Sequence, residues 1–216
     1  QGAISSLDAP YVAGVTGRAR NAKKLVGDLR LSGDAPPGGL IPSDAERLGS
    51  FLAVRLLTQE APDVAMDALF RPTLRALQGP HTGLDVRDMA RLAEACVAQS
   101  LCGLAFSALW PDAAGGAEAL DAASAVREEL VAALLRAERE RRVDGKLLIV
   151  DAPRAGLCSP LADRVALALA PLGHVVVARH VEGEGVTIAL RAFGASSDLG
   201  SAARHPADAG GGFARG

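Results

Sequence analysis

The sequence predicts an α/β fold, with a helical N-terminal region followed by a mixed, partly parallel β-sheet flanked by helices. Apolar residues recur at helical spacing up to about residue 142, whereas short apolar runs alternate with a single helical segment after Gly145. The chain has 216 residues, of which 49% are apolar and only 3% aromatic. Small aliphatic side chains of this kind favour closely packed helices. We therefore expect a helical linker or interaction region over residues 1–142 and an α/β domain over residues 143–216.

The first region contains several separate helical patterns. Ser43 and Glu46 have the spacing of a capping box and precede apolar residues at helical intervals, so a helix is predicted over residues 43–59. Residues 64–77 stay ambiguous, because Pro72 forbids one uninterrupted helix there. Further helices are predicted over residues 21–29, 85–100, 101–110 and 118–142.

The second region has the pattern of a sheet with one crossover helix. Compact apolar runs separated by glycine-containing turns predict its strands, and a longer helical pattern lies between the first and second of them. The strands are predicted over residues 147–150, 174–180 and 186–191, and the helix over residues 159–169.

Composition and charge exclude several functions. The formal net charge is −2, so any contact with nucleic acid must come from a local patch. Scarce aromatic residues argue against binding single strands by base stacking. The three cysteines form no Cys-x-x-Cys pair, which is typical of reduced thiols in a cytosolic protein and predicts no zinc site. No apolar run approaches the ~20 residues of a membrane span and no leader opens the chain, so we expect a soluble cytoplasmic protein without a membrane partner.

The end of the chain carries the candidate binding residues. The last predicted strand ends at Arg191, and a polar turn then leads to His205, Gly210 and Gly211. Glycine lets backbone N–H groups approach an anion closely, while arginine and histidine add directional donors. This order of residues favours a phosphate-binding site. The alternatives are an exposed arginine at a strand end, a turn histidine and a flexible glycine-rich terminus.

Other polar residues have weaker functional patterns. Arg18, Arg20, Lys23 and Lys24 form a basic cluster that either contacts a nucleic-acid backbone or an acidic partner, or is a plain solvated helix face. Cys158 lies at the start of a predicted helix, a position that can lower a thiol pKa, but no base lies near it in sequence.

No metal site is expected in this chain. His81, His174 and His180 lie far apart and lack ligand spacing. The sequence also contains neither Asp-His-His nor Asp-x-Asp, so the carboxylate and histidine cluster needed for metal-dependent hydrolysis of a phosphodiester is missing.

Four short motifs give the second region a family resemblance. They are Asp151-Ala152-Pro153 at a strand end, Ala162-Asp163-Arg164 in the following helix, Ala189-Leu190-Arg191 in the last strand, and the loop from His205 to Gly210. In order and spacing they resemble the C-terminal associated domain of RecJ-like proteins in the DHH phosphoesterase superfamily. More faintly, residues 12–17 and 101–104 resemble the segment that follows the catalytic domain in archaeal RecJ-like proteins.

Two departures from that pattern lie in the loop. Ala202-Ala203-Arg204 replaces the family's three glycines, and Asp208 replaces an alanine. Both changes indicate a weakened or repurposed pocket, in which Arg204 partly replaces the lost backbone donors.

The resemblance implies a non-catalytic module of a DNA replication or repair protein. Such a module would bind single-stranded DNA or RNA, or a nucleotide phosphate, weakly through Arg191, Arg204, His205, Gly210 and Gly211, and would dock onto a replisome partner such as the GINS complex. It would hold no cofactor. The alternative is the substrate-binding half of a single-strand exonuclease, whose manganese or magnesium would belong to a catalytic domain absent from this chain. A third possibility is that the alanine-rich helices serve assembly alone.

Overall fold

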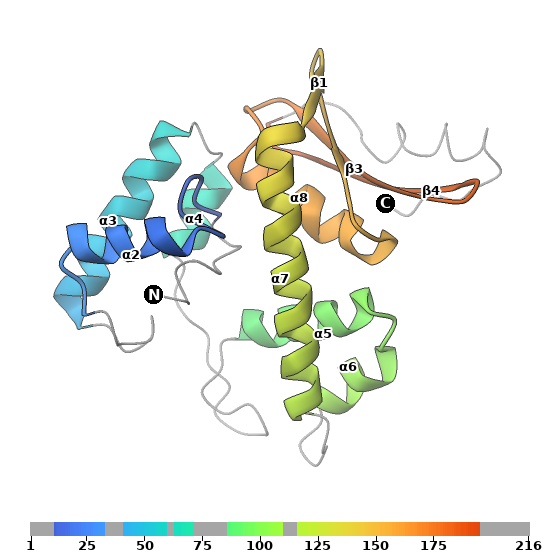
Figure 1. The fold of residues 1–216 in the computed structure, drawn as a ribbon, viewed down its shortest axis with the longest axis horizontal. Coiled ribbons are helices and arrows are strands. Elements are labelled where there is room, and N and C mark those ends of the chain that lie inside the picture. The colour runs from blue at the N-terminus through green and yellow to red at the C-terminus, as the bar shows by residue number, and fades with distance from the viewer. Residues whose placement is uncertain (1–10, 33–40, 60–62, 71–85, 110–115, 195–216) are drawn as a thin grey trace.

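The structure is a computed structural model that describes residues 11–32, 41–59, 63–70, 86–109 and 116–194 (Figure 1). It confirms the predicted fold class, because helices occupy the described chain up to Glu140 and a four-stranded mixed sheet follows. The elements are α2 (Ala19–Asp28), α3 (Pro42–Thr58), α4 (Asp63–Phe70), α5 (Val86–Ala98), α6 (Cys102–Leu109), α7 (Gly116–Glu140), β1 (Arg142–Asp144), β2 (Leu147–Asp151), the 3₁₀ turn η2 (Ala155–Leu157), α8 (Cys158–Ala168), β3 (Val175–Glu182) and β4 (Gly185–Ala192).

The sheet has the strand order β1-β2-β3-β4. Strands β2 and β3 are parallel, with α8 as their crossover, and the pairs β1-β2 and β3-β4 are antiparallel. The crossover places β3 beside β2 in the same direction, so Leu148 of β2 lies beside Val176 of β3. Val176 in turn lies beside Arg191 of β4. Strand β1 was not predicted, since Arg142-Val143-Asp144 is too short and too charged to show an apolar alternation.

Helices α7 and α8 cover one face of the sheet. The side chains of Leu148 and Val176 on that face are buried against Leu134 of α7 and Leu161 of α8 in one apolar core. Each of these four side chains is at most 1% exposed, so their burial contributes on the order of 2 kcal/mol apiece. Figure 1 shows α7 running from α5 and α6 at one end to the sheet at the other. One helix thus contributes to the cores of both regions.

The turn before α2 is attached to the sheet end of α7. Tyr11 is buried, and its hydroxyl donates to Glu138 Oε2 at 2.6 Å, while Arg18 Nη2 pairs with the same oxygen at 3.2 Å. Burial, and then this hydrogen bond, raise the pKa of Tyr11 above its usual value. Gly17 has a φ of +72°, and a Cβ there would overlap Leu135. The turn therefore requires glycine both for its backbone angle and for its distance from α7.

The start of α3 differs from the predicted capping box. Ile41 is the N-cap, Pro42 occupies the first turn, and no side chain caps the helix, so Ser43 already lies inside it. Asp44 instead accepts a hydrogen bond from the backbone N–H of Ser32 at 3.0 Å and pairs with Arg47. The Ser32 hydrogen bond lowers the pKa of Asp44. The capping-box prediction was wrong because the helix begins at Pro42, which leaves Ser43 past the N-cap position, whereas the helix predicted over residues 43–59 is confirmed.

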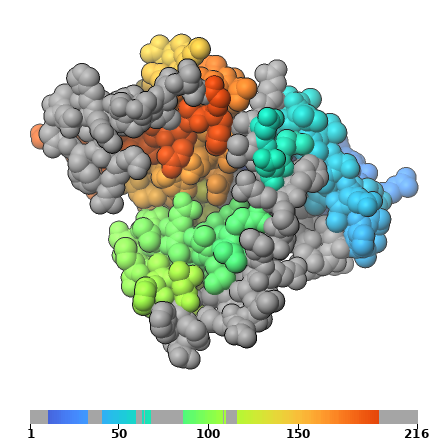
Figure 2. Space-filling view, turned by 180° about the vertical axis from the view of Figure 1, so that it is seen from behind, coloured from blue at the N-terminus to red at the C-terminus, as the bar shows by residue number. Residues whose placement is uncertain are grey.

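The C-terminal end of α5 lies on the loop between β2 and α8. Arg154 donates from Nη1 to the carbonyl of Ala98 and from Nε to Glu129 of α7, the latter at 2.7 Å. Gly156 lies so close to Ala98 that a Cβ would overlap its carbonyl oxygen. Figure 2 shows the green α5 and α6 next to the orange and red α/β region. This contact, which we call the α5 seat, joins the two regions through residues 154–156 and Ala98.

Replacing Gly156 with alanine should destabilise the protein. The added methyl group would meet the Ala98 backbone, which cannot move away as a flexible side chain can, so we expect a loss of about 1–3 kcal/mol in the free energy of unfolding. Urea denaturation followed by circular dichroism measures it. Gly49→Ala is the matched control, because Gly49 lies inside α3 with nothing within 4 Å of its added Cβ and should gain about 0.5–1 kcal/mol. Equal effects of the two substitutions would contradict the α5 seat.

Candidate functional site

Arg191 lies near the end of β4, on the face of the sheet that α8 covers. Its register partner in β3 is Val176, whose buried side chain belongs to the core under α8. Paired residues of neighbouring strands point to the same face, so the Arg191 side chain extends toward α8. It remains 43% exposed, which leaves its guanidinium accessible to solvent.

Two α8 side chains hold the guanidinium. Arg191 donates from Nε to Asp163 Oδ1 and from Nη2 to Ser159 Oγ at 3.1 Å. A third donation, from Nη1 to the carbonyl of Leu190 at 3.0 Å, fixes the group against its own strand. We call Ser159, Asp163 and Arg191 the Arg191 cluster. It connects β4 with the first two turns of α8.

The cluster limits how strongly Arg191 can attract an anion. A guanidinium has five N–H donors, and these three hydrogen bonds leave one on each terminal nitrogen. A phosphate oxygen can therefore reach Arg191 without breaking the existing contacts. Asp163 already neutralises the positive charge, however, and it repels an approaching anion. The geometry favours a positioned, weak anion contact over a strong one.

The spacing of Ser159 and Asp163 explains why both reach the same arginine. Residues four apart lie on one face of a helix, so α8 presents a hydroxyl and a carboxylate in adjacent turns toward β4. Asp163 already belongs to the Ala-Asp-Arg motif of the sequence, whereas Ser159 was missed. The sequence indicates Ser159 only through its spacing of four residues from Asp163 on a predicted helix. That spacing becomes informative once β4 is known to lie beside the helix.

Cys158 lies next to this cluster in the sequence, and its thiol is expected to be unreactive. Its side chain is buried, and its thiol donates to the carbonyl of Thr187 at 3.6 Å. Burial raises the pKa of Cys158 to about 11. The start of a helix therefore does not produce a low thiol pKa here, because burial disfavours the charged thiolate.

The Asp151-Ala152-Pro153 motif forms a different polar contact at the far end of β2. Asp151 pairs with Arg179 of β3 at 2.7 Å and with Arg142 of β1 at 3.8 Å. The carbonyl of Ala152 lies 3.1 Å from His180 Nδ1. These contacts connect three strands and leave Asp151 paired with two arginines. Within the described ranges, no group of three or more His, Cys, Asp or Glu side chains is arranged to hold a metal ion.

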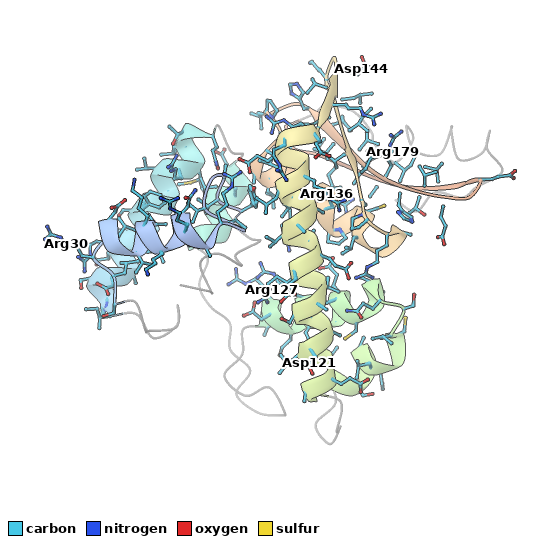
Figure 3. The ribbon with its side chains drawn as sticks, viewed as in Figure 1. Arg30, Asp121, Arg127, Arg136, Asp144 and Arg179 are labelled. Atoms are coloured by element: carbon cyan, nitrogen blue, oxygen red, sulfur yellow. The ribbon has the colours of Figure 1, made fainter. Side chains whose placement is uncertain are left out.

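The structure places only part of the predicted binding set. Arg191 is described, whereas Arg204, His205, Gly210 and Gly211 lie outside the described residues, as does His81. In the basic cluster near the N-terminus, Arg18 pairs with Glu138, while Arg20, Lys23 and Lys24 are exposed on α2. Figure 3 draws the described side chains, including Arg179 in the sheet.

Comparison with known proteins gives no relationship: no protein-family model and no curated protein sequence matches this chain. Among the helices that the structure describes, none is both long and apolar enough to cross a membrane.

The three thiols should differ sharply in reactivity. Cys102 is exposed, whereas Cys96 and Cys158 are buried, and burial raises the pKa of both buried thiols. At pH 8 we expect 5,5′-dithiobis(2-nitrobenzoate) to modify one thiol rapidly, and the other two only after denaturation. The Cys102→Ser variant should lose the rapid phase. A rapid phase that survives in this variant would show that a buried thiol is activated.

Proposed function

We propose that this chain is a non-catalytic, RecJ-like module of a DNA replication or repair protein, which binds the phosphate backbone of single-stranded nucleic acid beside Arg191. One observation supports this most. Asp163 and Arg191, taken from two of the four motifs that carry the resemblance, form an ion pair in the structure although they are 28 residues apart. The two motifs are then parts of one site, with Ser159 as its third member.

The proposed contact uses the free donors of Arg191 together with residues from the end of the chain. Arg204, His205, Gly210 and Gly211 follow β4 in the sequence and would supply further donors to the same phosphate. Each charge-assisted contact contributes roughly 1.5–3 kcal/mol at best, from which the free energy of ordering the loop is subtracted. Asp163 reduces the sum further. Binding is therefore weak and dependent on salt.

The same proposal gives the module a protein partner and a location. The exposed side chains of Arg20, Lys23 and Lys24 form a basic face on α2, suited to an acidic partner surface of a replisome component such as GINS. The site of action would be the cytoplasm. We favour this proposal over the hypothesis that the alanine-rich helices serve assembly alone, because assembly would not use the Arg191 cluster.

The alternative is that the module holds substrate for a nuclease. The Arg191 cluster would serve equally well to position a single strand in a metal-dependent exonuclease, with manganese or magnesium held by a separate catalytic domain. Digestion of a single-stranded oligonucleotide by this chain with added manganese distinguishes the two proposals in part, because cutting by the chain alone would contradict a non-catalytic module.

Removing the Arg191 side chain should weaken binding to single-stranded DNA. Fluorescence anisotropy with a labelled oligonucleotide at 50 to 200 mM salt measures the affinity, and Arg191→Ala should lower it by about tenfold, the scale of one charge-assisted contact. The slope of log affinity against log salt should fall by about one phosphate contact. Wild-type binding without any salt dependence would contradict a phosphate contact.

Two further variants make the assignment specific. Arg179→Ala is the matched control, because it removes an arginine that is also paired with an aspartate, but at a different point of the sheet, so binding should be unchanged. Asp163→Asn keeps the shape of the side chain and removes its charge, so it should strengthen binding. If Asp163→Asn weakens binding as much as Arg191→Ala, the cluster is only a structural pair.

A further inference from the structure

Strand β4 forms one edge of the sheet among the strands that the structure describes, and β1 forms the other. The β1 edge has only three residues, Arg142–Asp144, and two of them are charged. Short length and charge are two ways in which proteins prevent an edge from pairing further. The β4 edge instead has eight residues in unbroken register with β3, without a bulge, a proline or a lysine. Its one charged side chain, Arg191, is held on α8, so β4 has the features of a strand that pairs.

The backbone groups at the outer edge of β4 can be assigned from the bonds on the other side of β3. The carbonyl of Arg179 accepts a hydrogen bond from the backbone N–H of Ala152, which directly follows β2, at 2.7 Å. Arg179 and the other odd-numbered residues of β3 therefore bond toward β2, and the even-numbered ones bond toward β4. The register partners of the even-numbered residues are the odd-numbered residues of β4. The backbone groups that point outward from β4 consequently belong to Val186, Ile188 and Leu190.

The side chains of these outward-bonding residues lie on the face of the sheet opposite α8. Ile188 pairs with Arg179, whereas the neighbouring Ala178 is buried in the core under α8. Val186 and Ile188 are each 54% exposed, and Val181, the register partner of Val186, is 57% exposed. Figure 1 shows the hairpin of β3 and β4 extending away from α2 and α3. Exposed apolar side chains beside an edge of this length indicate an interaction surface for another strand.

A second copy of β4 fits this edge when the two strands run antiparallel. Residues whose backbone groups point outward must oppose each other, and the register with the longest overlap places Ile188 opposite Ile188 of the second copy. Val186 then lies opposite Leu190 of the second copy, so the apolar face continues across the contact. Glu184, exposed in the turn of the hairpin, comes beside the end of the second strand that carries Arg191. Opposite charges therefore meet at both ends of the contact.

We propose that this chain forms a two-fold dimer through β4, in which the two sheets join into one continuous sheet. Both copies of α8 lie on the same side of the joined sheet, because a two-fold axis perpendicular to a sheet maps each face onto itself. The assembly is closed, since its outer edges are then the short, charged β1 strands. The inference does not depend on the proposed nucleic-acid function.

Sedimentation equilibrium of the whole chain between about 1 and 200 µM tests the dimer, because micromolar homodimers dissociate within this range. The wild type should pass from monomer to dimer as its concentration rises. Ile188→Lys should raise the dissociation constant about tenfold or more, since two like charges would meet on the axis. Val181→Lys is the matched control, because its side chain is similarly exposed on the same face but belongs to an inner strand, so the dimer should persist. A wild type that stays monomeric throughout, or equal dissociation constants for the two variants, would overturn the proposal.

A cysteine on the axis tests the register independently. In a Cys102→Ser background, which removes the exposed thiol, Ile188→Cys should form a disulfide-linked dimer under mild oxidation, because opposed residues of paired strands lie within the Cα distance that a disulfide spans. Val181→Cys should stay monomeric on a non-reducing gel, since two copies of β4 separate it from its counterpart. Hydrogen–deuterium exchange in β4 should also slow as the concentration rises. Protection of β4 that does not change with concentration would show that another segment of the same chain covers the edge, and would contradict the dimer.

Discussion

The α5 seat holds the end of α5 against the α/β region, in addition to α7, which packs in the cores of both regions. The last carbonyls of a helix have no partner within it, and the Arg154 guanidinium supplies both a donor and a positive charge to the carbonyl of Ala98. The same side chain pairs with Glu129, so one arginine connects α5, α7 and the loop before α8. Gly156 allows the backbones to approach, because any side chain there would meet the Ala98 carbonyl. The positive charge of Arg154 and the missing Cβ of Gly156 thus both act at the carbonyl of Ala98.

The seat matters for the proposed phosphate contact because α8 begins directly after it. The first two turns of α8 provide Ser159 and Asp163 on one stripe and Pro160 and Arg164 on the next. The first stripe faces β4 and holds Arg191, while the second faces α5 and α7. A shift of this helix would therefore separate Ser159 and Asp163 from Arg191.

The sequence predicts the elements of this fold better than their contacts. Periodicity places α8 and the strands β2, β3 and β4 within a few residues, because each leaves a compact apolar run or a helical repeat in the sequence. It misses β1, which is three residues long, and it predicts a capping box at the start of α3 that the helix does not use, because Ile41 is the N-cap. For the site, the sequence identifies Arg191 as a candidate but not its pairing with Asp163. That pairing depends on a tertiary contact between β4 and α8, and local spacing does not encode it.

Hydrogen–deuterium exchange of the Arg154→Ala variant tests the α5 seat most directly. If Arg154 holds the end of α5 on the loop, peptides covering Val86–Ala98 and the start of α8 should exchange faster than in the wild type, while β3 keeps its protection. Arg154→Lys should restore little, because an ammonium lacks the planar fork that reaches Ala98 and Glu129 together. Wild-type protection of α5 in the Arg154→Ala variant would contradict this account of how the two regions are joined.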